Sequence, residues 1–229
     1  MFDDIKAVIR KDFLIEKRVG ILKGRVLPLG LAILLVFGFA IPPDLQILGS
    51  ERLVLSQVGP GLFWVSNFFV VLYLLDRSFS LEAEDGCLER LVTDGVDGVA
   101  FFFGKLISVF LGVSAVQAIL AVAAIIMFNI PADQLGLLLV VGLVGSLALA
   151  ATGTVFSALV VGAGSNQGLI ALLLTPAIVP VLLGAVRLTE IATDVSNDLS
   201  SSGWILLLLA LTALYTGVGI FTFDSLLED

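Results

Sequence analysis

Hydrophobic residues along the chain gather into long runs, and short segments between the runs hold most of the charged and turn-forming residues. A helix needs roughly 20 mostly apolar residues to cross about 30 Å of hydrocarbon, and six runs come close to that length. We therefore predict six transmembrane helices, interrupted in places by Gly, Pro or a charged residue. Their approximate ranges are 24–41, 58–75, 99–128, 135–161, 169–186 and 203–223.

Composition agrees with this pattern. Of the 229 residues, 59% are hydrophobic and 14% are charged, with a mean hydropathy of +1.12. A water-soluble domain cannot hide that much apolar surface. The predicted fold is an all-α membrane protein, with one six-helix transmembrane domain over residues 24–223 and a cytoplasmic tail over 224–229.

Residues 1–23 predict an amphipathic helix at the membrane interface, a cytoplasmic elbow before the first span. Its apolar residues recur every three or four positions and share one helical face. Asp12 and Glu16 interrupt this face, and Gly20 and Gly24 provide places to turn. A solvated helix without a special role and an elbow that also touches a partner both remain open. The residues of this face are Phe2, Ile5, Ile9 and Phe13, with Val8 beside them.

Basic residues predict the orientation, because Lys and Arg near the ends of spans stay on the cytoplasmic side. With both termini inside, seven basic residues lie in the N-terminal segment up to Arg25 and two lie in the segment 76–98. Lys105 adds another by reaching back from the third span. Only Arg52 and Arg187 lie outside. Both termini and the segment 76–98 are therefore predicted to be cytoplasmic.

That segment, "DRSFSLEAEDGCLERLVTDGVDG", has seven acidic and two basic residues. A short helix broken at Gly86 and parallel to the membrane would present a small apolar face among the acids. Such a face could dock into the groove of a partner protein. The acidic residues around it would then affect the association rate and the register of binding more than the affinity. A solvated loop without a partner remains the alternative. The apolar face consists of Leu81, Leu88, Leu91 and Val92.

The residues available for chemistry are few. The chain has no His and only one Cys, Cys87, which excludes a Ser-His-Asp triad, a His-based zinc site and an intrachain disulfide. "GVAFFFGKLIS" imitates a phosphate-binding loop, but five residues instead of four separate Gly98 from Gly104, and Leu106 stands where Ser or Thr must hold the metal. We predict no catalytic or metal site and no enzyme activity in this chain by itself, so ATP-driven work would need a separate ATPase.

Polar residues inside the spans predict packing more than transport coupling. No Asp, Glu or Arg lies near a midplane, which disfavours an ion-coupled carrier. Asn67 and Gln117 are interpreted as hydrogen-bonding contacts between helices. The fourth span has a strip of small residues that lets another helix approach closely. These are Gly142, Ser146, Ala150, Thr154, Ala158 and Gly162.

The fifth span contains two prolines in "LLLTPAIVPVLLGA". Pro176 and Pro180 each remove a backbone donor, so we predict a helix break there. A packed kink and a moving gate are both compatible with the sequence.

The run 58–91 resembles the second span and following loop of the haem exporter protein B family, also called cytochrome c maturation protein B. The segments 11–18, "KDFLIEKR", 103–106, "FGKL", and 172–185 are similar to that family as well. The motif residues are Pro60 and Gly61 at the start of the span, Trp64 within it, Asp76 and Arg77 at its end, and Asp85, Gly86, Leu88, Glu89 and Leu91 in the loop.

This resemblance implies a permease of the ABC-2 type in the cell inner membrane. It implies a coupling helix around 79–92 that contacts a cytoplasmic ATPase subunit of the cytochrome c maturation protein A type, where ATP binds. It also implies membrane partners of the C and D types, an exported haem chaperone and a possible homodimer, with haem as cargo rather than as a cofactor of this chain. No nucleic-acid partner is expected.

One departure from the family concerns the loop between the fourth and fifth spans. Family members commonly have basic residues there, whereas this chain reads "GAGSNQG" over 162–168. Within the resemblance, ATP drives either haem handling or release of the haem-loaded chaperone. An ABC-2 permease for drugs or lipids and a non-transporting membrane scaffold are the alternatives.

Overall fold

The computed structural model describes residues 1–42, 45, 54–84, 97–130, 134–162, 168–193 and 201–228. Within these residues the chain is helical and has no strand. Six helices are long and apolar enough to cross a membrane, which confirms the predicted all-α membrane fold with six spans. The elements are α1 (Phe2–Val19), the π-helical turn η1 (Leu22–Val26), α2 (Leu27–Ala40), α3 (Val54–Glu84), α5 (Gly98–Phe128), α6 (Leu135–Gly162), α7 (Gly168–Ala192) and α8 (Ser201–Glu228).

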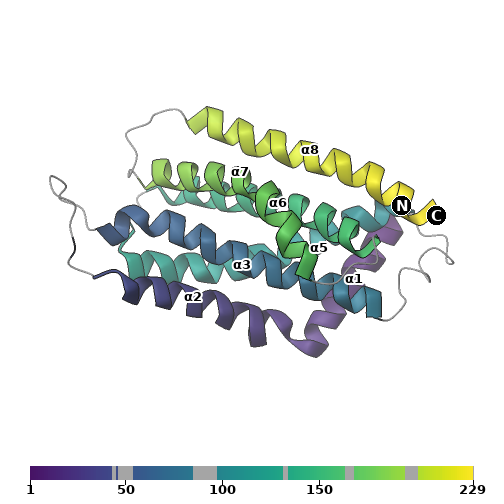
Figure 1. Ribbon diagram of the computed structural model, residues 1–229, viewed down its shortest axis with the longest axis horizontal. Helices are drawn as coiled ribbons and strands as arrows, with labels where there is room; N and C mark the ends of the chain where they lie inside the picture. Colours follow the sequence, from purple (N-terminus) through teal and green to yellow (C-terminus); the bar gives the residue numbers. More distant parts are fainter. Residues whose placement is uncertain are drawn as a thin grey trace.

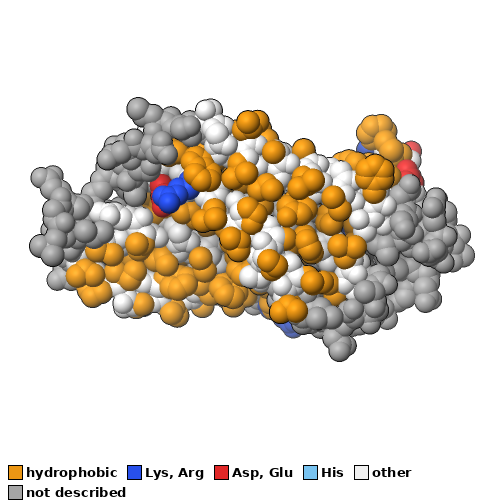
Figure 2. Space-filling model, turned by 45° about the horizontal axis from the view of Figure 1, so that its top comes forward, with side chains coloured by type: hydrophobic (Ala, Val, Ile, Leu, Met, Phe, Trp, Pro, Cys, Tyr) orange, Lys and Arg blue, Asp and Glu red, His pale blue; other side chains and the backbone are white. Residues whose placement is uncertain are grey.

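The six long helices run along the length of the molecule, whereas α1 crosses one end of the bundle (Figure 1). Both chain termini lie at that same end, as an even number of spans requires. α2 and α8 lie on opposite edges of the bundle in this view. Hydrophobic side chains dominate the middle of the surface in Figure 2, as expected for a surface in contact with lipid.

Several helices extend beyond their predicted ranges. α3 continues through residue 84, so the first nine residues of the acidic segment prolong the second span instead of forming a loop. Gly and Pro are absent between residues 76 and 84, and nothing in this stretch ends the helix. α7 continues to Ala192 and α8 to Glu228, so the predicted tail is helical almost to its end.

α6 packs against α3, α5, α7 and α8. The strip of small residues is confirmed as a packing surface, since Ser146, Ala150, Thr154 and Ala158 are all buried. Gly145 also faces the Trp64 ring, and a Cβ atom on it would collide with that ring. Because Gly145 has no side chain, the large Trp64 ring of α3 can pack directly against the backbone of α6.

The turn between α1 and the first span forms at Gly20, one of the two predicted positions. Gly20 is left-handed (φ 64°, ψ 39°), and its N–H donates to the Glu16 carbonyl over 2.7 Å. The Glu16 Oε1 atom accepts from the Leu22 N–H at 2.8 Å. Glu16 thus satisfies backbone groups on both sides of the turn. Gly24 lies within η1 and makes no separate turn.

Gly145→Ala should destabilise the bundle by about 1 to 3 kcal/mol, because the added methyl group overpacks against Trp64. The control is Gly136→Ala on the same helix, where a Cβ meets no atom within 4 Å. Thermal unfolding in detergent with tryptophan fluorescence compares the two. Equal midpoints would show that α3 and α6 are not packed as described.

Candidate functional site

The N-terminal helix is attached to the bundle by an ion pair between Asp12 and Lys105. The Lys105 Nζ atom lies 3.2 Å from Oδ1 and 3.1 Å from Oδ2 of Asp12, and it donates to the Ser78 Oγ atom at 3.0 Å. One ammonium group therefore joins α1, α3 and α5. The Lys105 side chain is only 1% exposed, so it does not reach back to solvent as predicted.

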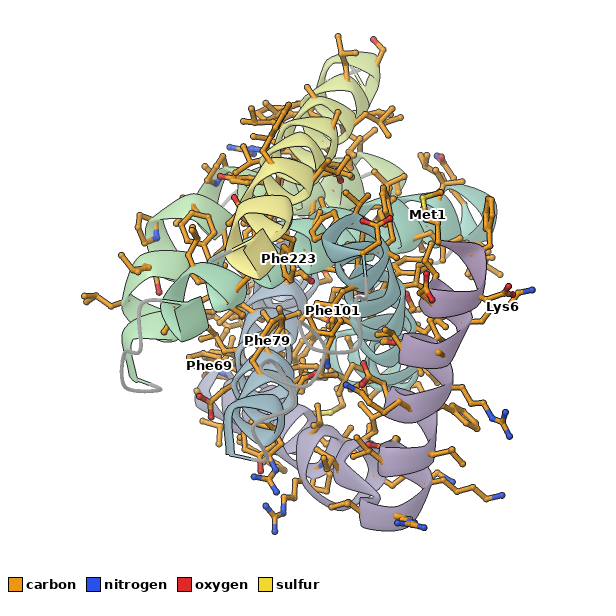
Figure 3. The ribbon with its side chains drawn as sticks, turned by 90° about the vertical axis from the view of Figure 1, so that its right-hand side faces the viewer. Met1, Lys6, Phe69, Phe79, Phe101 and Phe223 are labelled. Carbon is orange, nitrogen blue, oxygen red and sulfur yellow. The ribbon has the colours of Figure 1, made fainter. Side chains whose placement is uncertain are left out.

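Apolar contacts surround this ion pair. Val8 of α1 packs against Gly104, where a Cβ atom would lie 2.7 Å from the Val8 Cβ. The Lys105 Nζ atom lies 5.5 Å from the centroid of the Phe79 ring, a distance at which the ring attracts a cation. Figure 3 shows Phe79 and Phe101 toward the middle of this end of the bundle, whereas Lys6 points away from it.

The face of α1 that docks on the bundle differs from the predicted apolar face. Val8 and Asp12, four residues apart, point inward, whereas Phe2 and Phe13 are 74% and 69% exposed. The prediction followed the aromatic residues and treated Asp12 as an interruption. A buried Lys on α5 selects the Asp face, because an ammonium group in apolar surroundings needs a counter-ion.

Two polar contacts tie helices together in the other half of the bundle. The Trp64 Nε1–H donates to the Thr189 Oγ1 atom at 2.8 Å and joins α3 to α7. The Gln117 side chain accepts from the Ser146 hydroxyl at 2.6 Å and donates to the Gly142 carbonyl at 3.2 Å, which joins α5 to α6. The predicted role of Gln117 between helices is confirmed.

Asn67 differs from its prediction. Its Nδ2 atom donates to the Phe63 carbonyl one turn earlier in α3, at 2.9 Å. Its Oδ1 atom is buried without a hydrogen-bond partner among the described residues. Within the described part of the chain Asn67 therefore bonds within α3 and does not connect helices.

A mainly apolar cavity of about 160 Å³ lies beside these polar contacts, bordered by Trp64, Gln117, Ser146 and Thr189. Its lining has no ionisable side chain, so it offers no group for acid–base catalysis. Among the residues that the structure describes, no three His, Cys, Asp or Glu side chains lie close enough together to hold a metal ion.

The two prolines of the fifth span lie inside α7. α7 is assigned as one continuous helix with Pro176 and Pro180 inside it, and the bend predicted there, as a packed kink or a moving gate, stays a prediction. The Tyr215 hydroxyl of α8 donates to the Ala177 carbonyl at 3.3 Å, next to the first proline. The prolines leave the carbonyls of residues 172 and 176 without their helical donors, so the bond to Ala177 ties α8 to α7 beside this site and does not replace a lost donor.

The family motif lies within α3 more than at its ends. α3 begins at Val54, so Pro60 and Gly61 lie inside the helix and not at its start. Asp76 and Arg77 lie before its last two turns, and Arg77 lines a second cavity beside Lys105. The loop residues of the predicted coupling helix lie outside the described residues. These are Asp85, Gly86, Leu88, Glu89 and Leu91.

Lys105→Met should release α1, because Asp12 is then left partly buried without its counter-ion, at a cost of about 3 kcal/mol. Limited proteolysis of the purified protein should cleave near Gly20 faster than in the wild type. Adding Asp12→Asn should restore part of the protection, since it removes the orphaned charge. Lys6→Met, on the outer side of α1, is the control. Unchanged cleavage in Lys105→Met would contradict the docking role.

Comparisons with known proteins agree with the residues that carry the resemblance. The family model described as "CcmB protein" matches residues 4–228. Heme exporter protein B of Pseudomonas aeruginosa is 33% identical over 169 residues, covering 72% of this chain and 73% of that protein. Heme exporter protein B of Rhodobacter capsulatus is 28% identical over 186 residues, covering 81% of this chain and 82% of that protein. The chain is a multi-pass membrane protein and belongs to the CcmB family.

Proposed function

We propose that this chain is the membrane permease subunit of an ABC-type complex for haem export and delivery in cytochrome c maturation. The observation that carries the proposal is the family match over residues 4–228, together with relatives named heme exporter protein B. Six membrane-spanning helices fit such a subunit. The names of the relatives favour haem over the drug or lipid cargo of other ABC-2 permeases.

The energy comes from a separate cytoplasmic ATPase subunit of the A type, because the sequence has no complete phosphate-binding loop. The segment 79–92 contacts it as a coupling helix. α3 supports this assignment, since it runs unbroken from the membrane into the first part of that segment. Residues 64 and 84 are 20 positions apart, so α3 carries a displacement over about 30 Å.

The contacts of α3 with its neighbours would pass a displacement of this helix on to α5, α1 and α7. Near the coupling segment, Ser78 is bonded to Lys105 of α5, which also holds α1. About 14 residues earlier in α3, Trp64 is bonded to Thr189 of α7. A push on the cytoplasmic end of α3 is therefore transmitted to both ends of the bundle.

Haem iron is held by other members of the complex, the membrane partners of the C and D types or the exported chaperone. The chain has no His for an axial ligand, and Cys87 and Met127 are isolated candidates. The subunit transmits force and serves as a scaffold in the cell inner membrane. Both of its termini and its coupling segment lie in the cytoplasm. ATP hydrolysis then drives haem handling or release of the loaded chaperone.

Replacing Leu88 and Leu91 together by Asp should detach the ATPase from the membrane complex, because it removes the apolar anchor of the coupling helix. The measurement is copurification of the ATPase with this subunit from native membranes. The single variants Leu88→Asp and Thr93→Asp each add one negative charge, but only Leu88→Asp also removes an apolar anchor residue. Only Leu88→Asp should therefore weaken copurification of the ATPase. Full retention of the ATPase by the double variant would refute the coupling assignment.

A further inference from the structure

A second cavity, of about 630 Å³, lies between α1, the end of α3 and the first half of α5. This volume is typical of ligand pockets. Its walls differ from those of the cavity near Trp64, because six of its lining side chains are charged. The transmission of force proposed above involves the helices around this cavity, but it assigns no function to the cavity itself.

The charged residues of the lining carry a net positive charge. Four are basic and two are acidic. The acidic residues are already engaged, Asp12 with both Lys105 and Lys11, and Glu16 with the N–H of Leu22. Arg18 has no hydrogen bond or ion pair to any described residue. The basic residues are Lys11, Arg18, Arg77 and Lys105.

The other end of the cavity is apolar and open. Along α5 the lining runs from Lys105 to Ala115, ten residues or about 15 Å of helix, which is half the thickness of a hydrocarbon core. Leu111 and Ala115 border this end and are exposed on the outside of the described bundle, Leu111 to 53%. The cavity therefore opens at a depth where a membrane protein meets acyl chains.

We propose that this cavity binds one anionic phospholipid from the leaflet that surrounds this end of the bundle. The phosphate headgroup lies among the basic side chains between α1 and α3, and an acyl chain follows α5 past Leu111 and Ala115. A soluble anion would leave the apolar half unfilled, and a neutral amphiphile would not pair with the Arg18 guanidinium. The occupant therefore combines an anionic head with a chain about one leaflet long.

Native mass spectrometry of the full-length protein, purified in detergent with equimolar phosphatidylglycerol and phosphatidylcholine, tests this site. We expect one retained phosphatidylglycerol per chain. Arg18→Gln should reduce its retention about fivefold, the effect of one basic residue near a lipid surface. Lys17→Gln is the matched control, because Lys17 lies on the same turn of α1 but does not line the cavity.

A second pair of variants tests the acyl-chain end. Ala115→Trp should fill the apolar end and abolish retention, whereas Val122→Trp, exposed on the same helix outside the cavity, should leave it unchanged. Both positions are on the surface, so neither change disrupts the core. Millimolar inorganic phosphate should not displace the lipid, which separates a phospholipid site from a free phosphate site.

Equal retention of both lipids, or equal loss in Arg18→Gln and Lys17→Gln, would overturn the proposal. Displacement by inorganic phosphate, or full retention in Ala115→Trp, would also overturn it. Because the readout is lipid binding to this chain alone, its result does not depend on the ATPase or on haem.

Discussion

The arrangement of the N-terminal half depends on one buried cation. Lys105 lies within the apolar part of α5, and its ammonium group is stabilised by the Asp12 carboxylate of α1 and by the Ser78 hydroxyl and Phe79 ring of α3. An ammonium ion without these partners is costly in apolar surroundings. α1 must therefore stay docked across the end of the bundle, and the Gly20 turn must bring the chain back into the first span at a fixed place.

This contact links the end of α3 to the rest of the molecule. α3 runs past its predicted end toward the acidic segment, and Ser78 holds it beside α5. Farther along, α3 packs its Trp64 ring against Gly145 of α6 and bonds to Thr189 of α7. Since close-packed helices move together more readily than they deform, a displacement of α3 is shared by its neighbours.

The spacing of hydrophobic and small residues, and the length of the apolar runs, were sufficient to predict the six spans, the N-terminal helix and the packing strip of α6. Each of these depends on residues that are near one another along the chain. The Asp12–Lys105 pair joins residues 93 positions apart, and no local pattern relates them. Two signals for it were nevertheless present, a Lys inside an apolar run and an acid on an otherwise apolar helical face. The prediction for Asn67 was wrong because its hydrogen-bond partner depends on which helix lies opposite.

The most direct test of this account measures the distance between α1 and α3 in the assembled complex. In a Cys87→Ser background, spin labels at the exposed positions Lys6 and Phe69 report that distance by double electron–electron resonance. The account predicts one narrow distribution that stays the same with and without ATP, because α1 and α3 are held together through Lys105. A broad distribution, or one that shifts with ATP, would contradict it.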